Sequence, residues 1–301
     1  MVPAASGRRQ SFLGIKPVNS RKDTPLQIIT KILGYLVLIL VALTMVIPFI
    51  WMVTTSLKQP NSAFAYPPQL LPTEIDFRNY EMLFTLVPFG RYFINTLIVT
   101  ALTVVGQLII TSLAAYGFAR LHFIGRDTLF VIFLATMMVP YQVTLIPLFL
   151  IVFGLGWINT YTGLIVPAIS SVFGIFLLRQ AFMGVPRDYQ EAARIDGASE
   201  FRIYWRIFLP LNGPALATLA VFAFMGTWTD LLWPLLIART PEMRTLELGL
   251  AYFNSSTSAF RQTNWPLMMA ASVIVMLPVL LVYIFAQRYF VRGISLSGVK
   301  G

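Results

Sequence analysis

The sequence predicts an all-α membrane protein with six transmembrane helices and both termini in the cytoplasm. Of its 301 residues, 57% are hydrophobic and only 11% are charged, whereas a soluble domain carries about 25% charged residues. So few charges cannot cover a water-facing surface. The uncharged residues also collect in five long runs, which are residues 32–57, 92–119, 128–178, 207–229 and 262–287.

The lengths of these runs set the number of spans. A transmembrane helix needs about 20 mainly apolar residues, so four of the runs each hold one span. The run 128–178 would form a helix of about 76 Å against a hydrocarbon core of about 30 Å, and it must therefore cross twice. It turns best at 154–160, where two glycines, an asparagine and a tryptophan coincide. The predicted spans are 32–55, 92–119, 128–153, 161–178, 211–232 and 265–285.

The distribution of basic residues predicts the orientation. Six spans place 16 of the 22 Lys and Arg residues on the side that holds both termini and the loops 120–127 and 179–206. The acidic residues divide equally between the two sides, so the net charge of +10 belongs entirely to this side. Lys and Arg accumulate in cytoplasmic loops, which places both termini in the cytoplasm. A nucleic-acid-binding surface is also basic, but it does not explain the apolar runs, so we expect lipid and not nucleic acid as a partner.

The same topology divides the chain into segments. We expect a cytoplasmic N-terminal tail at 1–31, a first transmembrane helix with an outer segment at 32–91, a core with five transmembrane helices at 92–287, and a cytoplasmic C-terminal tail at 288–301. The outer segment 59–90 contains a predicted short helix near 77–86. A second outer segment, 238–264, contains the polar run 254–258.

Several predicted spans contain interior prolines. One reading is that neighbouring helices re-satisfy the freed carbonyls, so that the prolines are simply tolerated. The other is that they supply hinges for alternating access. The first reading is preferred, because a kink alone specifies no movement. The residues concerned are Pro48, Pro140, Pro147, Pro167 and Pro278.

The chain lacks the residues that most catalytic and cofactor sites need. It has no cysteine and a single histidine, His122, so neither a metal site with several convergent ligands nor a nucleophile with a neighbouring base can be assembled. No lysine directly follows a glycine, which excludes a phosphate-binding loop ending in Gly-Lys-Ser/Thr. We expect a non-catalytic chain without a metal or cofactor, whose energy comes from another subunit.

The loop 186–210 carries the most specific pattern. Gly197 divides it into two predicted short helices, because glycine closes a helix in the left-handed conformation. Ser199 is a natural N-cap for the second helix, with Glu200 in its first turn. An apolar face of that helix is predicted to consist of Phe201, Tyr204 or Trp205, and Phe208. The loop is either a connector lying against lipid headgroups or a rigid knob that docks into a partner.

Seven positions in this loop match a known motif with its spacing intact. They are Glu191, Ala192, Ala193, Gly197, Ile207, Leu209 and Pro210. The pattern resembles the EAA loop of permease subunits of binding-protein-dependent (type I) ABC importers, and it implies that family's permease fold. The resemblance implies that these residues, with Arg194 and Asp196, form coupling helices that contact a cytoplasmic ATPase.

Further segments resemble the carbohydrate-uptake branch of the same family. Those at 93–96, 115–120, 192–198 and 228–235 fit that branch, and 298–301 is similar to the end of the maltose-type second permease. Two positions depart from the pattern: Gly117 stands where Ala is usual, and Thr229 stands where Asn is usual. Thr229 belongs to the segment expected on the translocation path, so this departure concerns the identity of the solute and not the coupling.

The resemblance implies a complete transport system in a bacterial or archaeal plasma membrane. Its other members are a second homologous permease, two ATP-binding cassette subunits that bind ATP and Mg, and an extracytoplasmic solute-binding protein. The solute is expected to be a sugar or oligosaccharide, with glycerol phosphate, polyamine or peptide as alternatives and a membrane-embedded enzyme as a more distant one. Candidates for the solute path are Trp228, Asp230 and Trp233, which also fit an aromatic belt with an interfacial carboxylate.

Overall fold

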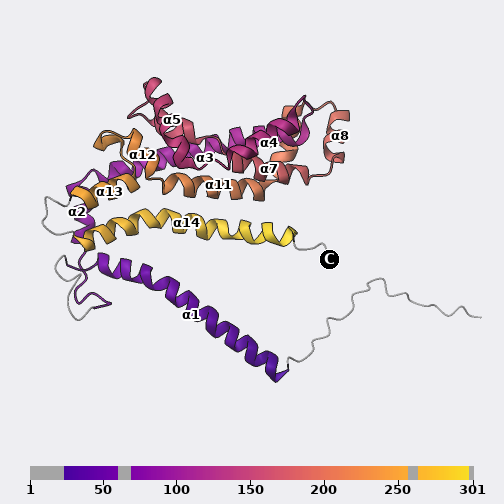
Figure 1. Ribbon diagram of the computed structural model, residues 1–301. Helices are drawn as coiled ribbons and strands as arrows, with labels where there is room; N and C mark the ends of the chain where they lie inside the picture. Colours follow the sequence, from indigo (N-terminus) through magenta and orange to yellow (C-terminus); the bar gives the residue numbers. More distant parts are fainter. Residues whose placement is uncertain (1–23, 60–68, 257–263, 298–301) are drawn as a thin grey trace, which may run out of the picture. The chain divides into compact units, whose positions relative to one another are not determined.

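A computed structural model describes residues 24–59, 69–256 and 264–297, and every regular element within them is helical (Figure 1). The chain forms two compact units, Met1–Ile50 and Trp51–Gly301. Residues 1–23 of the predicted N-terminal tail, residues 60–68 of the first outer segment, the last two residues of the polar run 254–258 and the motif at 298–301 lie outside the described residues. The all-helical architecture confirms the predicted fold class.

The first unit contains most of helix α1 (Pro25–Ser56). Thr24 and Gln27 form a capping box at its start, since each backbone N–H donates to the other residue's side-chain oxygen. The helix therefore begins seven residues before the predicted span. Its large apolar side chains from Leu26 to Ile50 are exposed, as expected for a helix that faces lipid.

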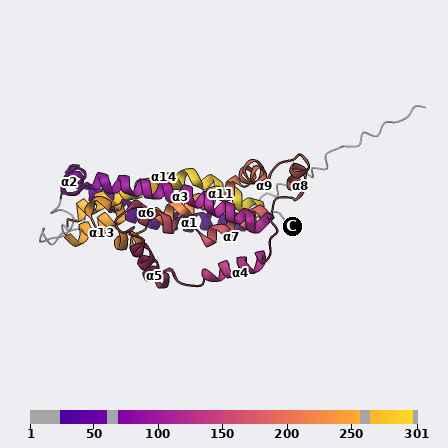
Figure 2. The ribbon, with the colours of Figure 1, turned by 90° about the horizontal axis from the view of Figure 1, so that it is seen from above.

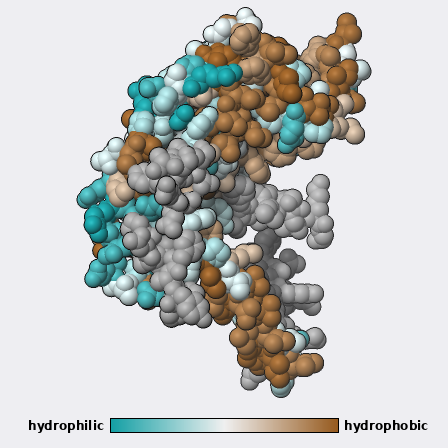
Figure 3. Space-filling model, turned by 60° about the vertical axis from the view of Figure 1, so that its left-hand side comes forward, coloured by the Kyte–Doolittle hydropathy of each residue, from teal (hydrophilic) through white to brown (hydrophobic). Residues whose placement is uncertain are grey.

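In the second unit, α3 (Phe89–Arg120) packs against both α7 (Val172–Met183) and α11 (Gly213–Trp228). Helix α14 (Trp265–Ser297) lies beside α11 and also contacts the short helix α2 (Arg78–Leu86), which confirms the predicted helix near 77–86. Large apolar side chains remain exposed along these helices. Figure 3 shows hydrophobic residues covering much of one face of the molecule.

Two predicted spans are bent rather than straight. Helices α4 (Arg126–Thr136) and α5 (Tyr141–Gly154) meet at 101°, and Pro140 ends the break between them. Helix α6 (Tyr161–Ile165) continues through the 3₁₀ turn Val166–Ala168 and meets α7 at 43°. Proline lacks the N–H that continues a helix, which accounts for the break at Pro140. Figure 2 shows α4 and α5 diverging at their junction.

By length and composition, three helices can cross a membrane unbroken, and up to six spans result if each bent pair counts as one. The unbroken helices are α1, α3 and residues 265–287 of α14, and the pairs are 126–154, 161–183 and 200–228. The last pair joins the predicted cytoplasmic loop to α11 at 81°. Helix α11 ends at Trp228 and α12 (Leu232–Ile237) is separate, so the predicted single span 211–232 was wrong at both ends.

The turn predicted at 154–160 is present. Helix α5 ends at Gly154 and α6 begins at Tyr161, with Gly156 and Asn159 at positive φ of 73° and 59°. The Oδ1 of Asn159 accepts hydrogen bonds from the backbone N–H groups of Arg239 at 2.9 Å and Thr240 at 3.1 Å. This asparagine therefore ties the turn to the start of the second outer segment.

The second outer segment contains structure that the sequence analysis did not predict. It forms the 3₁₀ turn Pro241–Met243 and helix α13 (Leu246–Ser256). Asn95 of α3 donates from Nδ2 to the backbone oxygens of Glu242 at 2.7 Å and Arg244 at 2.9 Å. Thr96 Oγ1 accepts from the Leu246 N–H at 2.8 Å. These contacts fix the segment to the N-terminal end of α3.

The close approach of α3, α7 and α11 depends on Gly174. A Cβ at this position would lie 2.7 Å from Leu219 Cδ1 and 2.8 Å from Thr111 Cγ2. We expect Gly174→Val to lower the melting temperature of the detergent-solubilised protein, since overpacking costs about 1–3 kcal/mol. Gly117→Ala is the matched control, because a Cβ there meets no atom within 4 Å. Equal melting temperatures for the two variants would contradict this packing.

Candidate functional site

The loop 186–210 consists of two helical segments divided at Gly197, as predicted. Helix α8 (Asp188–Ile195) ends in a Schellman motif. The Ala198 N–H donates to the Ala193 oxygen at 2.9 Å, and the Gly197 N–H donates to the Arg194 oxygen at 3.0 Å. Gly197 has φ of 76°, a conformation that side chains with a Cβ disfavour. The chain therefore reverses at a position where glycine is required.

The second segment begins as predicted and then departs from a regular α-helix. Ser199 caps α9 (Glu200–Ile203) by accepting from the Arg202 N–H. A π-helical turn (Tyr204–Phe208) follows and leads into α10 (Leu209–Leu211). The extra residue per hydrogen-bonded turn shifts the side-chain register.

This shift divides the apolar face that the sequence predicted. Tyr204 and Phe208 are buried, whereas the Phe201 and Trp205 side chains are 65% and 60% exposed. The expectation of a single face containing all of these positions was therefore wrong. The loop instead has an aromatic side packed on the helices and an aromatic pair left on its surface, with the Phe201 and Trp205 rings stacked at 6.5 Å.

Glu200 joins both parts of the loop to α3. The hydroxyl of Tyr116, on α3, donates to Glu200 Oε2 at 2.7 Å, and Gln190 Nε2 of α8 donates to the same oxygen at 3.3 Å. Arg194 Nε donates to Oε1 at 2.7 Å. Burial raises the pKa of Glu200, but the hydrogen bonds from Tyr116 and Arg194 outweigh it and hold the pKa below its usual value.

An aromatic layer lies beneath this carboxylate. The ring of Tyr116 contacts those of Phe182, Tyr204 and Phe208 at centroid distances of 6.4, 5.4 and 5.1 Å. The hydroxyls of Ser112 and Tyr204 lie 2.7 Å apart and share a hydrogen bond. These residues come from α3, α7 and the loop, so the loop packs on the helices as part of their core.

Arg120 closes the same junction from the end of α3. Its guanidinium is buried over the Phe208 ring, at 4.8 Å from the centroid, and donates to the backbone oxygens of Phe182 and Val185. Phe182 belongs to the last turn of α7, and Val185 lies two residues after the end of the helix. Arg120 thus adds side-chain hydrogen bonds to carbonyls at the end of α7 and just beyond it.

The predicted coupling residues occur together on this loop but face two ways. Three are partly buried and pack against the core: Ala193, Ile207 and Leu209. Six are exposed: Glu191, Ala192, Arg194, Asp196, Gly197 and Pro210. The sequence analysis assigned no role to Tyr116, Arg120 or Gln190. The first two fall in the segment 115–120, whose resemblance to the carbohydrate branch was the only signal available.

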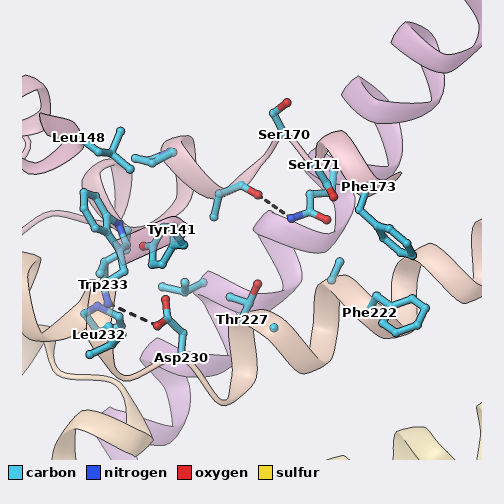
Figure 4. A pocket seen from close by; sticks show the side chains of 18 of the residues that line it. Tyr141, Leu148, Ser170, Ser171, Phe173, Phe222, Thr227, Asp230, Leu232 and Trp233 are labelled. Carbon is cyan, nitrogen blue, oxygen red and sulfur yellow. Dashed lines mark hydrogen bonds between the residues drawn. The ribbon is translucent and has the colours of Figure 1, made fainter. Parts of the chain in front are cut away.

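A second feature is a cavity of about 810 Å³ lined by α3, α5, α7, α11, α12 and the segments between them (Figure 4). Most of its lining is apolar. The polar and charged side chains that line it are Thr96, Gln107, Tyr141, Thr144, Ser170, Ser171, Thr227, Asp230, Trp233 and Thr245. Two of the three predicted solute-path residues, Asp230 and Trp233, are therefore among the lining residues.

The third, Trp228, lies in the core. Its ring stacks on Phe224 at 5.3 Å, and its Nε1 donates to the Val275 oxygen of α14 at 3.0 Å. Trp233 also has a packing contact, since its Nε1 donates to the Gly163 oxygen at 2.9 Å. The unusual Thr229 donates back to the Met225 oxygen of its own helix and is not among the lining residues.

Comparison with known proteins assigns the chain to a family. Residues 107–296 match the model of the binding-protein-dependent transport system inner membrane component. This match covers more than half of the chain. The chain belongs to this family.

Individual members of the family show how far the similarity extends. The chain is 38% identical to the arabinooligosaccharides transport system permease protein AraQ of Bacillus subtilis over 231 residues, which are 76% of this chain and 81% of that protein. It is 32% identical to the sn-glycerol-3-phosphate transport system permease protein UgpE of Brucella abortus, over 88% of this chain and 96% of that one. A crystal structure of a bacterial ABC transporter involved in the import of the acidic polysaccharide alginate has a chain that aligns with a TM-score of 0.80 and 26% identity, covering 89% of this chain and 99% of its own.

The family membership confirms several expectations from the sequence. This permease is a multi-pass inner membrane component of a binding-protein-dependent ABC importer and a non-catalytic subunit of it. Within the described part of the chain, no group of three or more His, Asp or Glu residues is placed to hold a metal ion.

The Glu200 junction predicts a pH dependence for the loop. Because the pKa of Glu200 is lowered on folding, its contribution is fully present above the usual glutamate pKa and is lost as pH falls through the lower folded-state value. We expect amide-exchange protection in α8, corrected for intrinsic rates, to fall in this acidic range. Glu200→Gln should reduce the amide-exchange protection of α8 about fivefold at neutral pH, which corresponds to the loss of about 1 kcal/mol of hydrogen-bond stabilisation. It should also make this protection nearly independent of pH in the acidic range.

Asp196→Asn is the matched control in the same loop, because Asp196 is exposed at the end of α8. It should keep the pH profile of the unmodified permease. An unchanged profile in Glu200→Gln, or a flattened one in Asp196→Asn, would remove Glu200 from this role.

Proposed function

We propose that the loop 186–210 couples this permease to a separate ATPase subunit. The observation that carries the proposal is that one side of the loop is exposed, whereas its other side is hydrogen-bonded to the helices of the second unit. Helix α8 presents Glu191 and Ala192 to solvent, and Figure 1 places it at one end of the second unit. The other side is bonded through Glu200 to Tyr116 of α3. A force applied to α8 therefore reaches α3 through short, directional contacts.

The cavity lies on the helices that such a force would move. Its lining includes residues of α3, α7 and α11, and the aromatic layer under the loop joins α3 to α7. Closure of ATP-bound partner subunits would displace the loop as a rigid body. The helices would then repack between two discrete arrangements, inward-open and outward-open. ATP and Mg would bind to the partner subunits.

The proposed complex contains a second homologous permease, two ATP-binding cassette subunits and an extracytoplasmic solute-binding protein. An ion pair supports a shared cytoplasmic side for the loops 120–127 and 179–206, because Arg179 contacts Asp127 at 3.6 Å. The C-terminal end of α14 lies at the same end of the unit as α8 (Figure 1). The outer segments 59–90 and 238–264 would contact the binding protein from the other side.

The proposed solute is a sugar or oligosaccharide that passes along the cavity beside Asp230 and Trp233. Sugar sites combine apolar and aromatic walls with a few placed polar groups, and this lining has that composition. The similarity to an arabinooligosaccharide permease favours this class. The similarity to a glycerol-3-phosphate permease favours the second candidate, a phosphorylated polyol.

The coupling role predicts a separation of transport from membrane insertion. Glu191→Lys reverses a charge on the exposed side of α8. Gly197→Val forces a β-branched residue to φ of 76°, at a cost of about 1–3 kcal/mol. We expect both variants to lose solute uptake and to lose ATPase subunits on co-purification, while their level in the membrane is unchanged. Glu81→Lys on the exposed side of α2 is the matched charge reversal outside the loop, and it should keep its ATPase subunits on co-purification. Normal uptake by the two loop variants would disprove the coupling role.

The solute class is tested by uptake of radiolabelled compounds into cells that carry the complete transporter. We expect uncharged oligosaccharides to accumulate, whereas glycerol phosphate, polyamines and peptides do not. Mass spectrometry of solute bound to the co-purified binding protein identifies the compound directly. Accumulation of glycerol phosphate without sugar uptake would establish the second candidate instead.

A further inference from the structure

We propose that Asp230 makes the cavity selective for uncharged, hydroxyl-rich solutes and against anionic ones. The inference rests on the proposed function, in which the solute passes along this cavity, and it defines the chemical class further. Asp230 is the single charged side chain among the described residues that line the cavity. The other polar lining groups open to a solute are hydroxyls and an amide, which bind sugar hydroxyls without a charge requirement.

The Asp230 carboxylate is not neutralised by the described part of the chain. Its Oδ1 accepts from the Trp233 N–H at 3.3 Å, and it forms no ion pair with a described Lys, Arg or His. Figure 4 shows the carboxylate beside the same space as Thr227 and Tyr141. A solute in the cavity therefore meets a negative group without a counter-charge from this chain.

The surroundings strengthen the effect of this charge. Charges interact more strongly near a protein interior than in bulk water, because the effective dielectric constant is lower. Ionisable groups at membrane depth are costly and persist where they have a function. An anionic solute would be repelled by Asp230, whereas a neutral polyol would donate hydrogen bonds from its hydroxyls to the carboxylate.

A preference for uncharged solutes distinguishes between compounds that similar proteins of this family import. The similar proteins are named for arabinooligosaccharides, which are uncharged, and for sn-glycerol-3-phosphate, which is anionic. The aligned crystal structure belongs to an importer of an acidic polysaccharide. Similarity of fold therefore does not define the charge of the solute, and the lining of the cavity provides the missing information.

The absence of cysteine from the sequence allows a direct test in the complete transporter. Thr227→Cys places one thiol of this chain in the cavity lining. Its rates of modification by a cationic trimethylammonium methanethiosulfonate and an anionic sulfonate methanethiosulfonate are measured by mass spectrometry of this chain. Both rates are divided by the rate of the same reagent with a small free thiol. We expect the cationic reagent to react about tenfold faster than the anionic one, because Asp230 attracts one and repels the other.

Variants of Asp230 show whether this residue is the cause. In the Thr227→Cys background, Asp230→Asn should bring the two normalised rates within about twofold of each other, whereas Asp230→Glu keeps the charge and should keep the preference. Glu242→Gln, on the exposed turn 241–243, is the control for general surface charge and should leave both normalised reagent rates unchanged. Protection assays add the solute: an uncharged oligosaccharide should slow modification, and a uronate oligosaccharide should do so only in Asp230→Asn.

Three results would overturn the proposal: equal normalised rates with Asp230 present, faster reaction with the anionic reagent, or a thiol that reacts with neither. Solute-stimulated ATPase activity and uptake, measured on the same preparations, test the proposed function separately. Absence of solute uptake with an intact preference for the cationic reagent would contradict the proposed function alone. Normal uptake with equal reagent rates would contradict the role of Asp230 alone.

Discussion

Buried polar side chains of α3 form the hydrogen bonds that hold the two ends of the second unit. At one end, Asn95 and Thr96 bind the backbone of the second outer segment. At the other, Ser112, Tyr116 and Arg120 bind the loop 186–210 and the end of α7. These positions span about 38 Å along the helix at 1.5 Å per residue. Hydrophobic burial does not distinguish a lipid contact from a helix contact within a membrane, so these polar contacts give α3 its specific neighbours.

In the proposed coupling, α3 is the path for movement between the cytoplasmic ATPase and the cavity. The Glu200 carboxylate reaches α3 through a neutral donor, Tyr116, and reaches α8 through Arg194 and Gln190. Glu200 thus forms directional hydrogen bonds with α3 on one side and with α8 on the other, and the aromatic layer packs beneath it. An element fixed in this way moves as one body, because packed interiors switch between discrete arrangements and do not deform continuously.

Much of this architecture is accessible from the sequence, because its signals are local. Uncharged runs define the membrane helices, and the turn chemistry of Gly197 and Ser199 defines the loop. The features that were missed depend on contacts distant in sequence or on competing local geometries. The bond between Tyr116 and Glu200 joins residues 84 positions apart, and no periodicity encodes it. The π-helical turn Tyr204–Phe208, in which Tyr204 is buried and Trp205 exposed, has no signal in the spacing of apolar residues.

The segment after α11 shows why residues grouped by a motif need not share a role. The chain leaves helical geometry between Trp228 and Leu232, so neighbouring side chains project in different directions. Trp228 bonds to α14, and Trp233 bonds to the Gly163 oxygen of α6. Asp230 lies between them with its carboxylate at the cavity. Each indole uses its single N–H donor in these bonds, which leaves the carboxylate as the polar group of the motif that is available to a solute. In the proposed solute path, the two tryptophans therefore hold neighbouring helices in place, and the aspartate determines which charge can pass.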